Sequence, residues 1–90
     1  MKKRIDMLVD MGYEDLMYFT SPEFDDAIIG VSEGDGCVVY SYDKMVECLM
    51  DSDCIGESEA REFIDYNTIR TLPYMGERAP IVVRNIYFEE

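Results

Sequence analysis

Residues 27–40 read AIIGVSEGDGCVVY, and this stretch decides the fold. Two apolar runs rich in strand-forming residues, 27–31 and 37–40, flank the segment Glu33-Gly34-Asp35-Gly36. The two glycines and the aspartate supply the positive-φ backbone positions that a tight turn between two strands requires. The stretch therefore predicts an antiparallel β-hairpin over residues 27–40.

The residues that follow the hairpin favour two helices. Apolar side chains recur at i, i+3, i+4, i+7 and i+8, which places them on one helix face: Tyr42, Met45, Val46, Leu49 and Met50. Ser41 or Asp43 can cap the start of this helix, and Gly56 can cap the start of the next. The second helix carries the apolar stripe Ala60, Phe63 and Ile64.

The two ends of the chain add one short helix and one strand. Residues 5–11 form a short amphipathic stripe that Gly12 ends, and Ser21-Pro22 predicts a single helical turn over 22–25. Pro80 precedes a last apolar segment over 81–88. The sequence thus predicts one α+β domain over 1–90: a small, three-stranded, largely antiparallel sheet with two to three helices packed on one face, a mixed sheet being the alternative.

Charge and composition exclude several classes of function. The chain has 90 residues, with 8 basic and 20 acidic side chains, no histidine and a net charge of −12. Nucleic acids and anionic membranes would be repelled by such a body, so neither is expected as a direct ligand. Histidine is the commonest general base and the commonest zinc ligand, and no phosphate-binding glycine loop follows a strand. We therefore expect no catalytic residue, no metal site and no cofactor.

The cysteines indicate a reducing compartment. Cys37, Cys48 and Cys54 are an odd number without close pairing, whereas an oxidised framework normally uses an even number. No run approaches the 18 or so apolar residues that a membrane span needs. A cytoplasmic location without a membrane partner is the expectation.

One stretch resembles a calcium-binding loop. Residues 51–62 match the ligand and glycine positions of such a loop at Asp51, Asp53, Gly56, Glu59 and Glu62. Ile55 stands where an oxygen ligand is expected, and Ser58 stands where an apolar residue is expected. The alternatives are a weak, single calcium loop and a solvated turn between two acidic helices.

The tyrosines also allow two interpretations. Six of them border predicted elements: Tyr13, Tyr18, Tyr40, Tyr42, Tyr66 and Tyr74. Tyrosine combines apolar area with a polar tip, which suits an interface anchor as well as the edge of a core.

The acidic side chains concentrate in the two central helices. Residues 43–65 contain only two cations, Lys44 and Arg61, but eight acids: Asp43, Glu47, Asp51, Asp53, Glu57, Glu59, Glu62 and Asp65. The first three repeat every four residues, and like charges at this spacing cost a few tenths of a kcal/mol each. This face either serves solubility or is shaped for a cationic partner. A globule of about 30 Å diameter with a charge of −12 carries about two-thirds of the charge of a duplex of that length.

Three stretches resemble small acidic proteins encoded on bacterial genomes and phage-derived elements. They are residues 24–31 (FDDAIIGV), 39–47 (VYSYDKMVE) and 62–70 (EFIDYNTIR). In size and charge the chain is also similar to phage anti-CRISPR and other anti-defence inhibitors, several of which imitate DNA. The resemblance implies an inhibitor as a class and transfers no functional residue.

The sequence therefore leads to two functional hypotheses. In the first, the eight acids bind a basic surface, that of a nucleic-acid-binding protein, and block it by imitating nucleic-acid charge. In the second, the chain is a small cytosolic domain that forms a homodimer through its hairpin or its last strand, with acidity serving only solubility.

Overall fold

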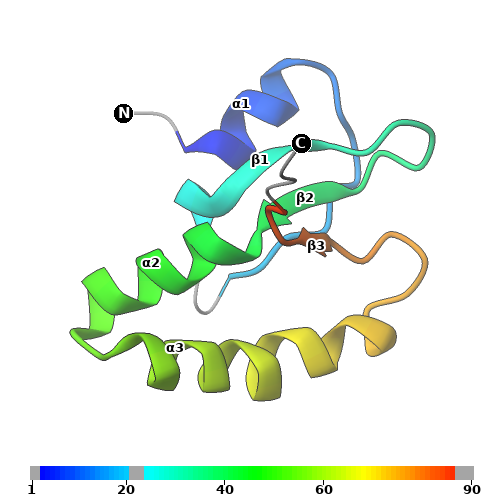
Figure 1. Cartoon of the computed structure of the whole chain (residues 1–90). Coiled ribbons are helices and arrows are strands. Elements are labelled where there is room, and N and C mark those ends of the chain that lie inside the picture. The colour runs from blue at the N-terminus through cyan, green and yellow to red at the C-terminus, as the bar shows by residue number, and fades with distance from the viewer. Residues whose placement is uncertain (1–2, 21–23, 87–90) are drawn as a thin grey trace, which may run out of the picture.

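The computed structural model describes residues 3–20 and 24–86 (Figure 1). The elements follow in the order α1 (Arg4–Asp10), η1 (Asp25–Ala27), β1 (Ile28–Val31), β2 (Val38–Ser41), α2 (Tyr42–Asp53), α3 (Glu57–Phe63), η2 (Ile64–Thr68), η3 (Ile69–Tyr74) and β3 (Ile81–Val83). The turns η1 and η3 are 3-10 helical, and η2 is π-helical. The fold is α+β: α2 and α3 form a helical hairpin at one end of the molecule, and α1 lies beside β1 (Figure 1).

The predicted β-hairpin is present. Strands β1 and β2 pair antiparallel, with Ile28 opposite Tyr40 and Val31 opposite Val38. Gly34 and Gly36 in the connecting turn have φ values of +86° and +68°, which other residues adopt only with strain. The two glycines therefore occupy positive-φ positions in the turn, as the sequence predicts.

The last strand makes the three-stranded sheet a mixed one. Strand β3 lies parallel to β2, with Val39 opposite Ile81 and Ser41 opposite Val83, so the predicted three-stranded sheet is present and its pairing is mixed rather than largely antiparallel. The chain passes through α2, α3, η2 and η3 before it returns, and a crossover of this length is what parallel pairing needs. The strand is also shorter than 81–88: residues 84–86 lie outside it, and 87–88 lie outside the described residues.

Helices α2 and α3 begin where the sequence places their caps. The Ser41 hydroxyl oxygen accepts a hydrogen bond of 3.4 Å from the Lys44 amide, and Gly56 precedes α3 as its N-cap. Met50 is the exception in the predicted stripe, because it lies at the exposed border of α2. The helical turn predicted over 22–25 appears as η1, one turn later, and residues 22–23 lie outside the described residues.

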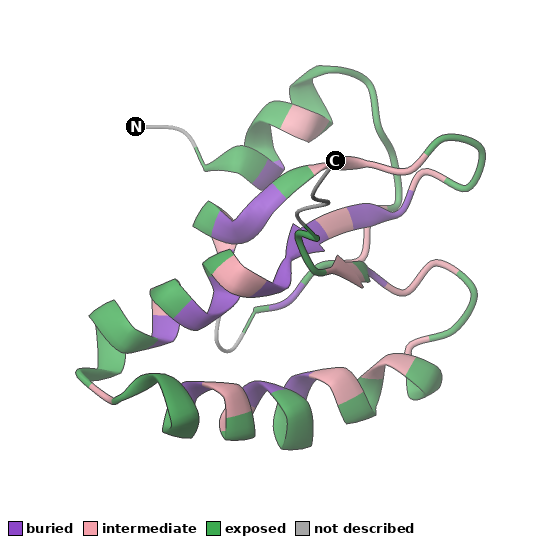
Figure 2. Cartoon of the chain, viewed as in Figure 1, coloured by how far each residue is buried: buried purple, intermediate pink, exposed green. Residues whose placement is uncertain are grey.

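The core lies between the sheet, η1 and the inner sides of the helical hairpin. Its largest fully buried side chains come from β2, α2 and η2: Val38, Tyr40, Tyr42, Met45, Leu49 and Ile64. Ala60 is also fully buried, and it belongs to the α3 face that packs on α2. The core thus fixes the helical hairpin against the sheet with its outer sides in water (Figure 2).

Helix α1 is capped by a residue from another element. The Asp25 carboxylate accepts hydrogen bonds from the backbone amides of Arg4, at 2.8 Å, and Ile5, at 3.2 Å. The guanidinium of Arg4 donates in turn to the carbonyl oxygen of Ile28, at 2.6 Å. A negative charge at a helix N-terminus also meets the positive end of the helix dipole. These contacts join α1 to η1 and β1.

We expect Asp25→Ala to lower the free energy of unfolding by about 1–2 kcal/mol, because it leaves two N-terminal amides of α1 without their acceptor. Amide hydrogen exchange in α1 should accelerate in the same variant. Asp26→Ala is the matched control, since it removes the same charge from an adjacent, exposed position. Equal losses in the two variants, measured by urea denaturation, would contradict a capping role for Asp25.

Candidate functional site

The eight acids that the sequence singles out lie on the helical hairpin. Asp43, Glu47, Asp51 and Asp53 belong to α2, Glu57, Glu59 and Glu62 belong to α3, and Asp65 belongs to η2. All are exposed except Asp43, which is half-buried at the start of α2. The structure therefore brings the whole set to one substructure of the fold.

The acids do not form a single face. The buried sides of α2 and α3 are turned toward each other and toward the core, so their exposed sides point away from one another (Figure 2). Glu47 and Asp51 lie on the outer side of α2, and Glu59 and Glu62 lie on the outer side of α3. The helical hairpin is thus negative on two opposite sides.

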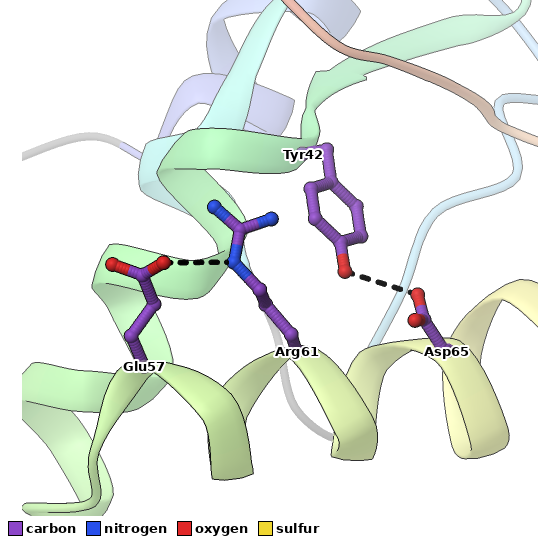
Figure 3. A network of polar contacts seen from close by, with 4 residues as sticks. All are labelled: Tyr42, Glu57, Arg61 and Asp65. Atoms are coloured by element: carbon purple, nitrogen blue, oxygen red, sulfur yellow. Dashed lines mark hydrogen bonds and ion pairs between the residues drawn. The ribbon is translucent and has the colours of Figure 1, made fainter.

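Three of the eight carboxylates have partners within the fold. Asp53 accepts a hydrogen bond of 3.3 Å from the hydroxyl of its neighbour Ser52, and Figure 3 shows the other two. Glu57 forms an ion pair of 3.0 Å with Arg61, one turn further along α3. Asp65 accepts a hydrogen bond of 3.0 Å from the hydroxyl of Tyr42. These two carboxylates contribute to the fold, and they are less available to a partner than the sequence suggests.

Tyr42 is the centre of a polar cluster that joins α2, α3 and the last strand. Its side chain is buried, and the Arg84 guanidinium carbon lies 4.2 Å from the centre of its ring. The parallel register causes this contact, because Ser41 and Val83 are opposite each other and Tyr42 and Arg84 come next. The Arg61 guanidinium carbon lies 5.4 Å from the centre of the same ring. Cation–π contacts of this kind stabilise the junction of the three elements.

The surroundings of Tyr42 keep its phenol protonated. Burial raises the pKa of Tyr42 above its ordinary value of 10.0, and Asp65 raises that pKa further through its hydrogen bond and its charge. Arg84 and Arg61 act in the opposite direction and do not outweigh these causes. The neutral phenol can therefore donate to Asp65 throughout the physiological range.

The raised pKa predicts a loss of stability at alkaline pH. Because the pKa of Tyr42 is higher in the folded chain than in the unfolded chain, its contribution is complete below about pH 10 and is lost as the pH rises toward the folded value. We expect the urea midpoint of the wild type to fall more steeply above about pH 10 than that of Tyr42→Phe. Parallel pH profiles of the two proteins would contradict this assignment.

Several carboxylates on the two outer sides have no partner in the described part of the chain. Glu47, Asp51, Glu59 and Glu62 make neither a hydrogen bond nor an ion pair there. Asp51 also lies in the last turn of α2 with Asp53, where a negative charge opposes the helix dipole and costs a few tenths of a kcal/mol. These acids of α2 therefore do not stabilise the fold. This observation bears on function, because it suggests a role for these acids outside folding.

The tyrosines divide between core and surface. Tyr40 and Tyr42 are buried, whereas Tyr66 and Tyr74 are 61% and 89% exposed. Tyr66 lines a shallow groove of about 310 Å³ on the outer side of α3 and η2, together with Glu59, Glu62, Phe63 and Asn67. We call this the Tyr66 groove. Its lining residues recur at i, i+3, i+4, i+7 and i+8 from Glu59, which is the spacing of one helix face, so this spacing is the sequence signal that could have indicated the groove.

The stretch that resembles a calcium loop is helical. Helix α2 continues through Asp53 and α3 begins at Glu57, so only residues 54–56 connect them. Asp51 and Asp53 are therefore in a helix rather than in a loop that turns around an ion. Among the residues that the structure describes, no group of three or more His, Cys, Asp or Glu side chains is arranged to hold a metal. The alternative of a turn between two acidic helices is the one that the geometry matches.

The cysteines occupy three different environments. Cys37 is buried, Cys48 is half-buried and Cys54 is exposed, and all three are free thiols. Burial raises the pKa of the Cys48 thiol, and the charges of Asp26, Asp51 and Glu47 raise it further. Cys48 is thereby kept in its protonated, weakly nucleophilic form.

Cys54 adopts a backbone conformation that favours glycine. Its φ of 55° and ψ of 42° are left-handed, at the position that ends α2. We expect Cys54→Gly to raise the free energy of unfolding by about 0.5–1 kcal/mol, because it relieves strain at an exposed position. Cys54→Ala removes the thiol but keeps the strain, so it should leave the urea midpoint nearly unchanged. A gain in Cys54→Ala equal to that in Cys54→Gly would contradict the explanation.

Two cavities adjoin the segment 18–20. One of about 300 Å³ is lined by residues of α1, η1 and the sheet, including Ile5, Asp25 and Tyr40. The other, of about 250 Å³, is lined by Asn67, Thr68 and Thr71 of the helical segment. In the first cavity, both carboxylate oxygens of Asp25 already accept hydrogen bonds from α1, so this acid is committed to holding the helix.

Within residues 3–20 and 24–86, no helix is both long and apolar enough to cross a membrane. Comparison of the chain with protein-family models, with curated proteins and with solved structures found no match. The comparison thus adds no activity, partner or functional residue to those that the geometry supports.

Proposed function

We propose that the chain is a non-catalytic binding protein that presents its helical hairpin to a basic protein and blocks the nucleic-acid-binding site of that protein. The observation that carries the proposal is the set of carboxylates on the outer sides of α2 and α3 that have no partner among residues 3–20 and 24–86. Those of α2 cost stability where they stand, so a role outside folding explains them better than the fold does.

The two-sided distribution of charge suggests how the protein would bind. A pair of packed helices is about 10 Å thick in one direction and about 20 Å wide in the other. A helical hairpin of this size, negative on opposite sides, suits a channel or cleft with basic walls better than a flat surface. Nucleic-acid sites are often channels of that kind, lined by Lys and Arg that contact phosphates. An inhibitor of the type carried by phages and mobile elements would use such a mode.

The proposal is tested by affinity capture from a cell lysate at low salt, with the bound proteins identified. We expect recovery of a nucleic-acid-binding protein that is released at about 0.5 M salt, because screening then acts within roughly 4 Å. Recovery of no protein, or only of proteins that resist the salt, would contradict binding by charge.

A second candidate function is self-association, and one observation favours it. Strand β3 forms an edge of the three-stranded sheet, and Ile81 on it is 38% exposed. An open edge strand can pair with a second copy across a two-fold axis. Size-exclusion chromatography with light scattering separates the candidates: a dimer that persists at high salt favours self-association, and a monomer excludes it.

A further inference from the structure

We propose that the Tyr66 groove receives an arginine side chain of the basic partner. The inference rests on the proposed function, since it names the contact at the centre of that interface. The groove has a volume of about 310 Å³ and is formed by Glu59, Glu62 and Phe63 of α3 with Tyr66 and Asn67 of η2. Its size and open shape suit one side chain rather than a cofactor.

The charged groups that the groove offers to a ligand are acceptors. Glu59 and Glu62 each contribute a carboxylate with no internal partner in the described part of the chain. The Asn67 side-chain amide uses one of its two N–H donors on the Phe63 carbonyl oxygen, at 3.2 Å, and its amide oxygen can accept from a ligand. A ligand that satisfies this set must bring positive charge and several N–H donors.

The aromatic wall distinguishes arginine from lysine. Tyr66 is 61% exposed, which gives a cation access to its ring. A guanidinium is planar, weakly hydrated and able to stack on a ring while it donates to a carboxylate, whereas an ammonium is compact and strongly hydrated. The chain shows the same preference internally, because Arg84 lies over Tyr42 and the Arg70 guanidinium carbon lies 5.6 Å from the centre of the Tyr66 ring.

Arg70 therefore competes with the incoming side chain. It follows Tyr66 by about one helical turn, whereas Glu62 precedes Tyr66 by one turn. The partner's guanidinium would bind at the Glu62 end of the groove, and the positive charge of Arg70 would weaken that binding. Arg70→Gln should consequently strengthen it.

The test uses two blocked peptides of equal charge, acetyl-Gly-Arg-Gly-Arg-Gly-amide and its lysine counterpart, titrated into isotope-labelled protein and followed by NMR. We expect the largest chemical-shift changes at Glu59, Glu62, Tyr66 and Asn67. The arginine peptide should bind about two- to fivefold more tightly than the lysine peptide. Tyr66→Leu should abolish this preference, and Arg70→Gln should increase it.

Tyr74→Leu is the matched control, because Tyr74 is 89% exposed and does not line the groove. It should leave the arginine preference unchanged. Equal affinity for the two peptides, shifts spread evenly over α2 and α3, or a preference that survives Tyr66→Leu would each overturn the inference. Those results would leave binding by overall charge intact, whereas a lysate capture that recovers no basic protein would remove the proposed function itself.

Discussion

Replacement of Tyr42 by alanine is expected to lower the free energy of unfolding by about 3–5 kcal/mol, a large part of the total for a domain of this size. The side chain is buried at the junction of α2, α3 and β3, with Arg84 over its ring and Asp65 at its hydroxyl. Alanine would leave a cavity there and remove the ring on which Arg84 stacks. Urea denaturation followed by circular dichroism measures the loss, and hydrogen exchange in β3 should accelerate with it.

Two controls separate the contributions at this position. Tyr42→Phe keeps the ring and removes only the hydrogen bond to Asp65, so it should cost about 1 kcal/mol. Tyr66→Ala truncates a tyrosine that is mostly exposed, and it should cost less than about 0.5 kcal/mol. A loss in Tyr42→Ala no larger than that in Tyr66→Ala would show that the cluster does not hold the three elements together.

Neutralisation of four exposed acids of the helical hairpin is expected to weaken partner binding by at least about tenfold at low salt, because attraction between opposite charges governs encounter and register. The variant combines Glu47→Gln, Asp51→Asn, Asp53→Asn and Glu62→Gln, all at exposed positions. It should fold at least as well as the wild type, since like-charge repulsion in α2 and opposition to its dipole are both reduced.

The matched control removes the same charge elsewhere. Glu14→Gln, Glu33→Gln, Asp35→Asn and Glu77→Gln are also exposed and lie in loops and in the β-hairpin turn. Figure 1 shows that turn at the opposite end of the molecule from the connection between α2 and α3. The control variant should retain most of the affinity. Equal weakening in both variants would mean that net charge, rather than the helical hairpin, attracts the partner.

Local signals in the sequence predicted most of the elements. The turn glycines predicted the β-hairpin, and the apolar period with Ser41 predicted the start of α2. The direction of β3 was not predictable from its own residues, because a short apolar run can pair with a neighbouring strand in either direction. The one signal available was the long helical connection between β2 and β3, which suits parallel pairing.

The candidate site was predictable in composition but not in arrangement. The sequence shows which residues are acidic, yet the partners of those acids depend on contacts between distant positions. Asp65 binds Tyr42 across 23 residues, and Asp25 caps α1 across 20. The division of the acids between two sides follows from how α2 packs on α3. Residue spacing alone does not specify these features.

Competition by DNA tests the central claim most directly. The tagged protein is incubated with cell lysate at low salt, with and without an excess of a DNA duplex, and the retained proteins are compared. If the helical hairpin imitates nucleic-acid charge, a basic protein is retained without DNA and displaced when the duplex is added. Retention that is indifferent to the duplex and to salt, or no retention at all, would contradict the account.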